Sequence, residues 1–493
     1  MRQLLAEAPC SAAEYLNRRA RFRQAPASAG FFGTDQTKQT GLGGPLMNPV
    51  LVKRKFDERG TKRVKLALVD IDGVLRGKYV SLDKFWSAVE SDLGFCDVIF
   101  GWDISDALYD NVRFTGWHTG YPDMRARIDT TTFRLIPWEA DTAFFLLDLI
   151  DKKGAPIAVS PRQVFRQVVE RAASLGYTPY FSAEYEFFFF RETPQSLREK
   201  NYRNLSSLSP GMFGYSVLRA AANSEFVLQV IDQLAEFDVQ LEGFHTETGP
   251  GVYEAAVAAA PGLQGADRAA LFKTAVKEIA ARHGLIPTFM AKWNADLPGS
   301  GGHIHQSLWD SKKGQNLFAG ENCGMSQLMQ HYIAGLAASL PELTAMMCPT
   351  INSYKRMVPG FWAPVNATWG LDNRTSAVRA IVGEDKSTRV ETRLSGADMN
   401  PYLAMAASLA AGLDGIERKL ELPPPAKDAY AANALPLPAN LAEATRLFRQ
   451  SSLARKAFGE EFVEHYAATR EWEVRQYERA VTDWELARYF EAV

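Results

Sequence analysis

Short apolar runs separated by turn signals dominate the first third of the chain and predict β-strands. Residues 64–69 (VKLALV) form a run typical of a buried strand, and residues 70–73 (DIDG) form a turn signal directly after it. A second strand begins at residues 76–79, so the two runs predict a hairpin. Further short strands are expected over residues 98–102, 133–136 and 144–149. This part of the chain is therefore predicted to be a small α+β domain.

The pattern changes after a Lys/Gly/Pro linker at residues 152–156. Ser160 and Pro161 suit an N-cap and a first helical residue, which predicts a helix over residues 162–175. Strand-like and helix-like segments are then mixed. The tail from about Leu441 is helical and ends in an amphipathic stretch over residues 472–490. We expect three parts, which cover residues 1–46, 47–156 and 157–493.

The first 46 residues have the composition of a disordered leader. An arginine cluster between residues 18 and 23 would suit a transit peptide, but Glu7 and Glu14 and the absence of a long apolar core argue against one. Met47 stands shortly before the first strand-like segment and is an alternative start. The sequence holds no apolar run near the roughly 18 residues that span a bilayer.

Composition excludes several classes of function. Hydrophobic residues make up 46% and charged residues 23%, as in an ordinary soluble globular protein. The net charge of −2 argues against a nucleic-acid binder, which would show a basic domain or stripe. Cys10, Cys96, Cys323 and Cys348 form no CxxC pair, which argues against a disulfide framework and against a thiolate zinc site. We therefore expect a cytoplasmic protein with small-molecule substrates and no membrane partner.

Residues 182–190 (SAEYEFFFF) carry the clearest local signal for chemistry. Side chains of a strand alternate between its faces, so Glu184 and Glu186 are predicted to project to the same side. Burying two bare carboxylates beside four phenylalanines is costly, and a metal ion would satisfy both. An exposed edge strand with two solvated acids is the alternative, against which the Phe run argues.

Two further segments add candidate ligands. Glu247 and Glu254 flank a Gly/Pro turn that can bring them together, although such acid-turn-acid segments are also common in surface loops. A Gly-rich loop at residues 299–302 precedes His303 and His305, which would share one face if extended. Glycines allow backbone amides to approach a phosphate or carboxylate closely. A lone histidine is more often a structural residue than a ligand, but two of the chain's seven histidines directly after a Gly-rich loop make the two interpretations about equal.

Residues 389–393 (RVETR) place an acid between two arginines on one strand face. Such a triplet is either a structural ion pair or the wall of a site for a metal and an anionic substrate. Many cations nearby favour recognition of polyphosphate and carboxylate, although each alone is compatible with a surface charge. They are Arg356, Arg374, Arg379 and Lys386.

The acids and one histidine form an oxygen-rich set that points to magnesium or manganese rather than zinc. Six ligands suffice for two ions, the number that a phosphoryl-transfer clamp uses. The candidate ligands are Glu184, Glu186, Glu247, Glu254, His303 and Glu391.

Together these segments resemble the glutamine synthetase superfamily from about Val64 to the C-terminus. Seven motifs stand in the family's order: VDIDGVLRGK, SAEYEFFFF, ETGPGVYE, GSGGHIHQSL, NSYKRMVPG, NRTSAVR and RVETRLSGADMNPYL. Any one of them is moderate evidence, and seven in order are strong. The resemblance implies an α+β chain with a small β-grasp N-terminal domain and a catalytic α/β domain built on a curved antiparallel sheet. It also implies a homo-oligomer of stacked hexameric rings, a dodecamer, with active sites between subunits.

The resemblance also implies roles for single residues. Glu186, Glu247 and Glu254 would hold one metal, and Glu184, His303 and Glu391 another, with two or three Mg²⁺ or Mn²⁺ ions per active site. Gly299, Arg356 and Arg393 would bind L-glutamate. The ATP site would include His305, Ser307, Arg374, Arg379, Lys386 and Arg389. Arg374 and Arg393 would act in catalysis together with Asp103.

The implied reaction has two steps. The γ-carboxylate of glutamate attacks the γ-phosphate of ATP, while metals and arginines spread the charge. An amine then displaces phosphate from γ-glutamyl phosphate, which gives a γ-glutamylamide, ADP and phosphate.

Three departures from the family favour its glutamate–amine ligase members over true glutamine synthetases. Trp362 stands where the family has the Glu that binds and deprotonates ammonium, and Pro298 replaces an Asn that contacts glutamate. Asp103 is retained from an ammonium-binding element that a neighbouring subunit provides, but the glycine after it is lost. Indole cannot accept a proton, so an organic amine is predicted, with Asp103 as candidate base. Arylamines, alkylamines and polyamines all remain open.

Three alternatives compete with this interpretation. Use of ammonia would restore plain glutamine synthetase. A structural or sensory homologue without activity is the second, but all five metal-site acids and His303 are present. The third is a haloacid-dehalogenase phosphatase, whose first motif matches residues 66–75 with Asp70 as nucleophile. That last interpretation leaves six later motifs unused.

Replacement of Asp70 separates the ligase from the phosphatase. We expect Asp70→Asn to retain ligase turnover, because Asp70 is a hairpin residue in the preferred interpretation. The measurement is ATP-dependent phosphate release with glutamate and an amine. Loss of turnover in correctly assembled protein would reopen the phosphatase interpretation.

Overall fold

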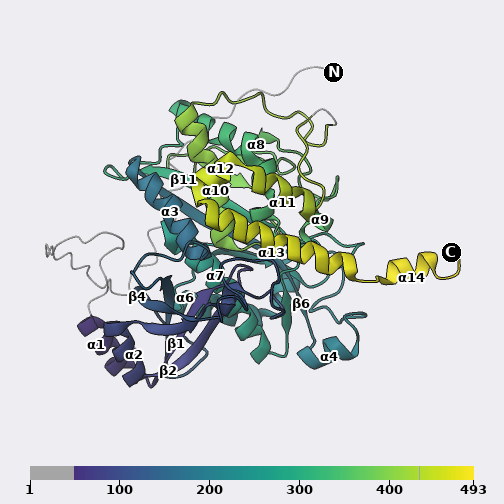
Figure 1. Cartoon of the computed structure of the whole chain (residues 1–493). Helices are drawn as coiled ribbons and strands as arrows, with labels where there is room; N and C mark the ends of the chain where they lie inside the picture. The colour runs from purple at the N-terminus through teal and green to yellow at the C-terminus, as the bar shows by residue number, and fades with distance from the viewer. Residues whose placement is uncertain (1–48, 432–433) are drawn as a thin grey trace, which may run out of the picture. The chain divides into compact units, whose positions relative to one another are not determined.

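Two β-sheets organise residues 49–431 and 434–493, which the computed structural model describes (Figure 1). The expected leader and Met47 lie outside the described residues. The strands are β1 (Arg63–Val69), β2 (Leu75–Ser81), β3 (Leu93–Cys96), β4 (Asp123–Leu135), β5 (Thr142–Ile150), β6 (Tyr177–Phe190), β7 (Leu241–Thr246), β8 (Val252–Val257), β9 (Ala260–Pro261), β10 (Ile286–Thr288), β11 (Gly302–Asp310), β12 (Trp369–Leu371), β13 (Val378–Ile381) and β14 (Arg389–Thr392).

Helices surround the sheets and form most of the C-terminal third. They are α1 (Pro49–Arg59), α2 (Leu82–Ser91), α3 (Pro161–Ser174), α4 (Pro194–Glu199), α5 (Val217–Ala221), α6 (Ser224–Glu236), α7 (Gly262–Arg282), α8 (Gln327–Met347), α9 (Ser353–Arg356), α10 (Pro401–Arg418), α11 (Leu441–Gln450), α12 (Ser452–Phe458), α13 (Glu460–Arg479) and α14 (Asp483–Tyr489), with 3-10 turns η2 (Asp97–Phe100) and η3 (Glu321–Cys323). The predicted helix after Ser160 and the predicted helical tail are both confirmed.

The first sheet has the strand order β2-β1-β5-β4-β3, with β1 and β5 parallel. The predicted hairpin is confirmed as β1 and β2, and Asp70 accepts the backbone N–H groups of Asp72 and Val74 in its turn. The strand predicted over residues 98–102 is wrong, because the chain there forms the 3-10 turn η2. That turn buries the adjacent side chains of Ile99 and Phe100, which a strand would direct to opposite faces.

Strand β1 is buried on both faces, which explains its continuous apolar run. Leu66 and Leu68 point into a core that also contains α1 and α2 residues. Ala67 and Val69 point the other way, into the core of the larger sheet. A strand buried on both faces has an almost unbroken hydrophobic sequence rather than an alternating one.

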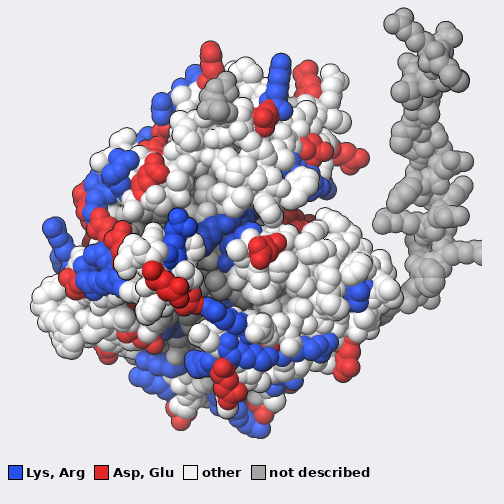
Figure 2. All heavy atoms as spheres, turned by 90° about the vertical axis from the view of Figure 1, so that its right-hand side faces the viewer, with Lys and Arg blue, Asp and Glu red and all other residues white. Residues whose placement is uncertain are grey.

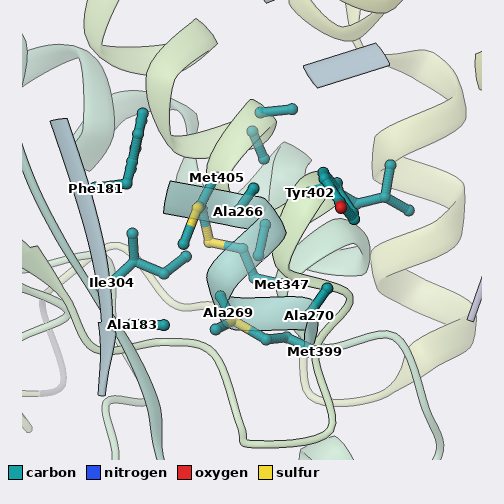
Figure 3. Close-up of a cluster of buried hydrophobic side chains, with 14 of the residues drawn as sticks. Phe181, Ala183, Ala266, Ala269, Ala270, Ile304, Met347, Met399, Tyr402 and Met405 are labelled. Carbon is teal, nitrogen blue, oxygen red and sulfur yellow. The ribbon is translucent and has the colours of Figure 1, made fainter. Parts of the chain in front are cut away.

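The second sheet has nine strands, with β12-β13-β14-β11-β6-β8-β7 as its continuous order. Its longest strand, β6, pairs with both β11 and β8 in antiparallel registers. Figure 3 shows the core on the apolar face of this sheet, where Phe181 of β6 and Ile304 of β11 lie on the same side as Met405 of α10. Helices therefore cover one face, and the other face is left for polar side chains.

Outside the core the chain is mixed in charge. Figure 2 shows Lys and Arg together with Asp and Glu across one face, as the net charge of −2 suggests. No helix within residues 49–431 and 434–493 has the length and apolar character needed to cross a membrane. Cys96, Cys323 and Cys348 are free thiols.

One buried guanidinium joins the five-stranded sheet to helices α3 and α7. Arg162 of α3 binds Asp129 of β4 at 2.8 Å, Asp148 of β5 at 2.6 Å and Asp267 of α7 at 2.9 Å. Tyr402 of α10 donates a further hydrogen bond to Asp267 at 2.6 Å. Burial opposes ionisation of Asp129, yet the charge of Arg162 holds the pKa of that carboxyl below its ordinary value. The guanidinium of Arg162 thus holds α3, β4, β5 and α7 together.

Replacement of Arg162 by Met should destabilise the protein by about 3–5 kcal/mol at pH 7.5, because it leaves three carboxylates without their shared cation. Urea unfolding at fixed protein concentration measures the loss. A depressed carboxyl pKa stabilises the fold above the unfolded pKa, and this contribution is lost as pH falls through the folded pKa. The difference between wild type and variant should therefore shrink as the pH falls below about 4, the ordinary pKa of an aspartate.

Arg127→Met is the matched control. Arg127 lies on β4 and pairs with Asp92 at 3.4 Å, but its side chain is exposed, so a change within about 0.5 kcal/mol is expected. Equal losses in the two variants would contradict the role assigned to Arg162.

Candidate active site

Cross-strand pairing brings charged and imidazole side chains into one row on the polar face of the large sheet. Residues directly opposite each other on neighbouring strands point to the same face. From β13 to β7 the row consists of Arg379, Glu391, His305 and His303, Glu184 and Glu186, Glu254, and His245. We call these eight residues the charged row. The predictions that Glu184 and Glu186 share a face, and that His303 and His305 do, are confirmed.

The first half of the charged row is centred on Glu184. His303 Nδ1 lies 3.0 Å from Glu184 Oε1 and 3.6 Å from Glu391 Oε1, and His305 Nε2 lies 3.5 Å from Glu184 Oε2. Although burial opposes ionisation, the two histidines hold the pKa of Glu184 well below its ordinary value. Glu391 is fully buried, and His305, Arg393 and His303 lower its pKa to about 2 against the effect of burial. Both carboxylates are thus anionic at neutral pH.

The second half of the charged row contains Glu254 and His245 and lies where β7 and β8 meet. Glu247, which follows β7, lies next to it. Glu247 and Glu254 approach each other across the Gly/Pro turn as predicted, with His245 Nε2 at 3.3 Å from Glu247 and 3.5 Å from Glu254. The Tyr215 ring stacks on His245 with centroids 4.4 Å apart. Burial and the charges of Glu184, Glu186 and Glu247 raise the pKa of Glu254 to about 9. Without a cation, this group of acids takes up a proton instead.

His245 is a site residue that sequence reasoning missed. A signal was present, because His245 and Glu247 stand two positions apart at the end of a strand and so share a face. The sequence does not reveal the register between β7 and β8, which places both residues beside Glu254.

The two halves each fit a divalent cation. Ligand atoms of Glu184, His305 and Glu391 all lie within 4.8 Å of one another, and so do those of His245, Glu247 and Glu254. Two carboxylates and one imidazole suit Mn²⁺ and also Mg²⁺. Both His303 and His305 face Glu184, so either imidazole is placed to act as the ligand in the first half.

Three arginines border the first half of the row. Arg379 donates to Glu391 Oε2 at 2.9 Å, and Arg393 donates to Glu391 Oε1. Arg356 is buried, and it donates to the backbone carbonyls of Leu394 at 3.1 Å and Arg393 at 3.3 Å. Among the described residues no carboxylate lies within ion-pair distance of Arg356, and burial lowers its pKa. A buried cation without an ion-pair partner is suited to bind an anion.

The Gly-rich loop packs too closely for side chains. A Cβ on Gly299 would lie 2.7 Å from both Ala291 O and Arg356 Cγ, and one on Gly301 would lie 2.4 Å from His303 Nε2. Gly301 also donates its backbone N–H to Glu186 Oε2 at 2.7 Å. These glycines let the loop lie directly against Arg356 and the charged row.

The remaining nucleotide-site candidates are less tightly gathered. Arg389 donates from Nε to His305 Nδ1 at 3.2 Å, and Ser307 accepts a hydrogen bond from the Trp309 indole at 2.9 Å. Arg374 is exposed, and its carbonyl accepts from Arg393 Nε at 2.9 Å. Lys386 is exposed on the turn before β14.

Trp362 stands on the loop that follows Arg356. Its side chain is 64% exposed, and its φ of 60° places it in the left-handed region, where a non-glycine residue costs free energy. The neighbouring Phe361 ring lies 4.7 Å from Lys292 Nζ, on the segment that leads to Gly299. The loop therefore holds the indole outward, beside the segments that carry Arg356 and Gly299.

Asp103 is held elsewhere in the same chain. Its Oδ1 accepts the backbone N–H groups of Ser105 at 2.8 Å and Ala107 at 3.0 Å, and its Oδ2 accepts the Trp472 indole N–H at 3.0 Å. Within the described part of one chain, no hydrogen bond or ion pair joins Asp103 to Trp362 or to the charged row.

Comparison with known proteins gives a consistent set of relatives. Residues 158–489 match the family model described as glutamine synthetase, catalytic domain. The type-1 glutamine synthetase 2 of Dictyostelium discoideum is 50% identical over 438 residues, which cover 87% of this chain and 84% of that protein. The glutamate–isopropylamine ligase of a Pseudomonas species is 40% identical over 452 residues, which cover 90% and 98% respectively. The solved structure of apo GmaS without ligand has a TM-score of 0.77 at 28% identity, covering 88% of this chain and 98% of that one.

Removal of one acid from the charged row should weaken metal binding. We expect Glu254→Gln to bind Mn²⁺ about tenfold or more weakly, because one carboxylate ligand is lost. Electron paramagnetic resonance of free Mn²⁺, titrated into protein stripped with EDTA, measures the affinity. Glu242→Gln, an exposed acid on the same strand as His245, should bind Mn²⁺ like wild type. Unchanged affinity in Glu254→Gln would exclude this acid as a ligand.

Proposed function

The chain belongs to the glutamine synthetase family, and we propose that it is an ATP-dependent ligase that joins the γ-carboxylate of L-glutamate to an organic amine. The products are a γ-glutamylamide, ADP and phosphate. Its relative from Pseudomonas is named a glutamate–isopropylamine ligase, which supports an organic amine as acceptor.

The observation that carries this proposal is Trp362 on the loop after Arg356. An indole can neither accept a proton nor neutralise an ammonium ion by charge, but it offers an apolar wall and a cation–π face. Its outward position suits contact with the carbon substituent of an amine. A pocket with an apolar wall distinguishes similar amines only modestly, so arylamines, alkylamines and polyamines are all acceptable classes.

Glutamate is assigned to the buried cations beside the Gly-rich loop. Arg356 has no carboxylate partner among the described residues and is therefore suited to a substrate carboxylate. Arg393 lies next to it, and Gly299 keeps the loop close enough for backbone contact. Planar guanidinium groups bind carboxylates in a fixed geometry, which would orient the γ-carboxylate for attack.

ATP is assigned to the β14 side of the charged row. Its phosphates would be bound by Arg374 and Arg379, with Lys386, Arg389, His305 and Ser307 lining the rest of the site. Arg374 is exposed and has no ion-pair partner among the described residues, so it is available to bind a phosphate. In the first step Arg374 and Arg393 would stabilise the charge on the transferred phosphoryl group.

Two or three Mg²⁺ or Mn²⁺ ions are assigned to the charged row and Glu247. One set is Glu186, Glu247 and Glu254, to which the geometry adds His245, and the other is Glu184, His303 and Glu391, with His305 as an alternative imidazole. Bound ions would neutralise phosphate oxygens and help to align ATP with glutamate.

Asp103 is proposed to take the proton from the incoming amine. Three N–H donors fix its carboxylate, and an ionised carboxylate has about four acceptor positions, so one is left for an ammonium group. The base would come from a neighbouring subunit, in a homo-oligomer of stacked hexameric rings with active sites between subunits.

The proposal extends to the division of the chain into domains and to its location in the cell. We assign residues 47–156 to a β-grasp-like domain, supported by a mixed five-stranded sheet with a parallel central pair and a helix after its first hairpin. Residues 157–493 would be the catalytic domain, and the proposed location is the cytoplasm, supported by the free thiols.

Glutamine synthesis from ammonia is the second candidate. It is favoured by the 50% identity to the type-1 glutamine synthetase 2 of Dictyostelium discoideum. A protein without activity is disfavoured, because the metal-site acids and the arginines next to them are all present and gathered in one place.

Trp362→Glu should shift preference from organic amines toward ammonia. The new carboxylate would attract ammonium and accept its proton, so kcat/KM for ammonia relative to isopropylamine should rise by about tenfold or more. ATP-dependent phosphate release with saturating glutamate is the measurement.

Phe361→Glu is the control, because it puts the same charge one residue away, beside Lys292. An equal shift in both variants, or no shift in Trp362→Glu, would show that Trp362 does not determine the acceptor.

A further inference from the structure

Lys292 is a buried lysine between β10 and β11 that the proposed reaction does not use. Its side chain is only 8% exposed, and within residues 49–431 and 434–493 no carboxylate forms an ion pair with it. Instead, its Nζ donates a hydrogen bond to Leu297 O at 2.5 Å and lies 4.7 Å from the centroid of the Phe361 ring. A backbone carbonyl and an aromatic face thus compensate the buried ammonium, and they belong to two different segments.

A third segment fixes the backbone of Lys292. The Asn352 side chain accepts the backbone N–H of Lys292 at 2.8 Å and donates to its backbone carbonyl at 2.8 Å. Asn352 directly precedes α9, which ends at Arg356, one of the residues assigned to glutamate. Lys292 therefore stands where three segments meet: the Gly-rich loop after Leu297, the helix of Arg356 and the loop that carries Trp362.

Trp362 is held in place through its two neighbours in sequence. Phe361 lies against the ammonium of Lys292. Ala363 is buried, and its carbonyl accepts a hydrogen bond from the Tyr430 hydroxyl at 3.4 Å. A left-handed backbone such as that of Trp362 persists where surrounding contacts enforce it. Of these two anchors, the one at Phe361 leads back, through Lys292, to the Gly-rich loop.

We propose that Lys292 positions Trp362 relative to the glutamate site and so sets the width of the pocket that receives the amine. This inference rests on the proposed function, in which the indole contacts the carbon substituent of the amine. The ammonium of Lys292 binds Leu297 O and the Phe361 ring at once, and it therefore fixes the Trp362 loop against the Gly-rich loop. The arginines and metal ligands assigned to phosphoryl transfer do not depend on this contact. Loss of Lys292 should therefore act on KM for the amine more than on kcat.

Phosphate release with isopropylamine as the varied substrate, at saturating ATP and glutamate, tests the inference. Lys292→Met keeps an apolar side chain of similar length but lacks the ammonium. Its KM for the amine should rise at least about fivefold, while kcat changes less than about threefold. Lys292→Arg retains a cation and N–H donors, so its KM should lie within about twofold of wild type.

Lys78→Met is the matched control. Lys78 Nζ also donates to a backbone carbonyl, that of Gly94 at 2.9 Å, and lies 5.0 Å from the centroid of an aromatic ring, that of Phe95. This pair of contacts belongs to the five-stranded sheet rather than to the segments around Trp362. Lys78→Met should therefore have the kcat and KM of wild type.

Two further measurements show whether Lys292 acts through Trp362 and whether the variant is intact. In a Trp362→Ala background, Lys292→Met should raise KM less than about twofold, because the loop no longer presents an indole. The Mn²⁺ affinity of Lys292→Met should equal that of wild type, because the charged row is separate from this contact. If Lys292→Met does not fold, Phe361→Leu takes its place, since it removes the other partner of the same contact from an exposed position.

Hydrogen exchange followed by mass spectrometry separates failure of this inference from failure of the proposed function. Peptides that cover residues 357–366 should exchange faster in Lys292→Met than in wild type and Lys292→Arg, whichever acceptor the enzyme uses. Faster exchange in an enzyme that accepts ammonia alone would refute the proposed acceptor and still support Lys292 as the residue that holds the loop. Unchanged exchange would overturn the inference. An equal rise in KM in Lys292→Arg, or an equal effect of Lys292→Met with and without Trp362, would overturn it as well.

Discussion

Mutual repulsion of carboxylates on one face of a β-sheet is the constraint on which this structure depends. The registers of β6 with β11 and β8 place Glu184, Glu186 and Glu254 side by side, and Glu247 joins them from the turn. Such a cluster persists only if cations compensate it or if one acid takes up a proton, as the raised pKa of Glu254 indicates. The fold thus holds acids together at a cost in stability, as expected of a site for metal-bound phosphates.

The rest of the molecule holds that cluster in place. The opposite face of the same strands packs Phe181, Ala183 and Ile304 against helices (Figure 3), so a one-residue slip of β6 would bury its glutamates in the core. Arg162 of α3 joins two strands of the five-stranded sheet to α7 through three aspartates, and α7 packs in the core of the larger sheet. In the proposed function, specificity for the amine is left to exposed loops such as the one that carries Trp362, which lies outside the core.

Local pattern was enough to predict much of the fold and site. The hairpin at Asp70, the shared face of Glu184 and Glu186, and the convergence of Glu247 and Glu254 all follow from strand alternation and turn chemistry. The position of His245 beside Glu254 depends on the register between β7 and β8, which a local sequence pattern does not reveal. A three-residue apolar run such as residues 98–100 suits a strand and a 3-10 turn equally, which explains the error over residues 98–102. The partners of Arg162 and of Asp103 are distant in sequence, and only the folded chain brings them together.

The central claim is that this family member transfers glutamate to an organic amine. Its most direct test is the kcat/KM of the wild-type protein for ammonia and for isopropylamine, followed as glutamate- and ATP-dependent phosphate release. The account predicts a higher value for isopropylamine and a γ-glutamylamide as product. A higher value for ammonia, with glutamine as product, would contradict it.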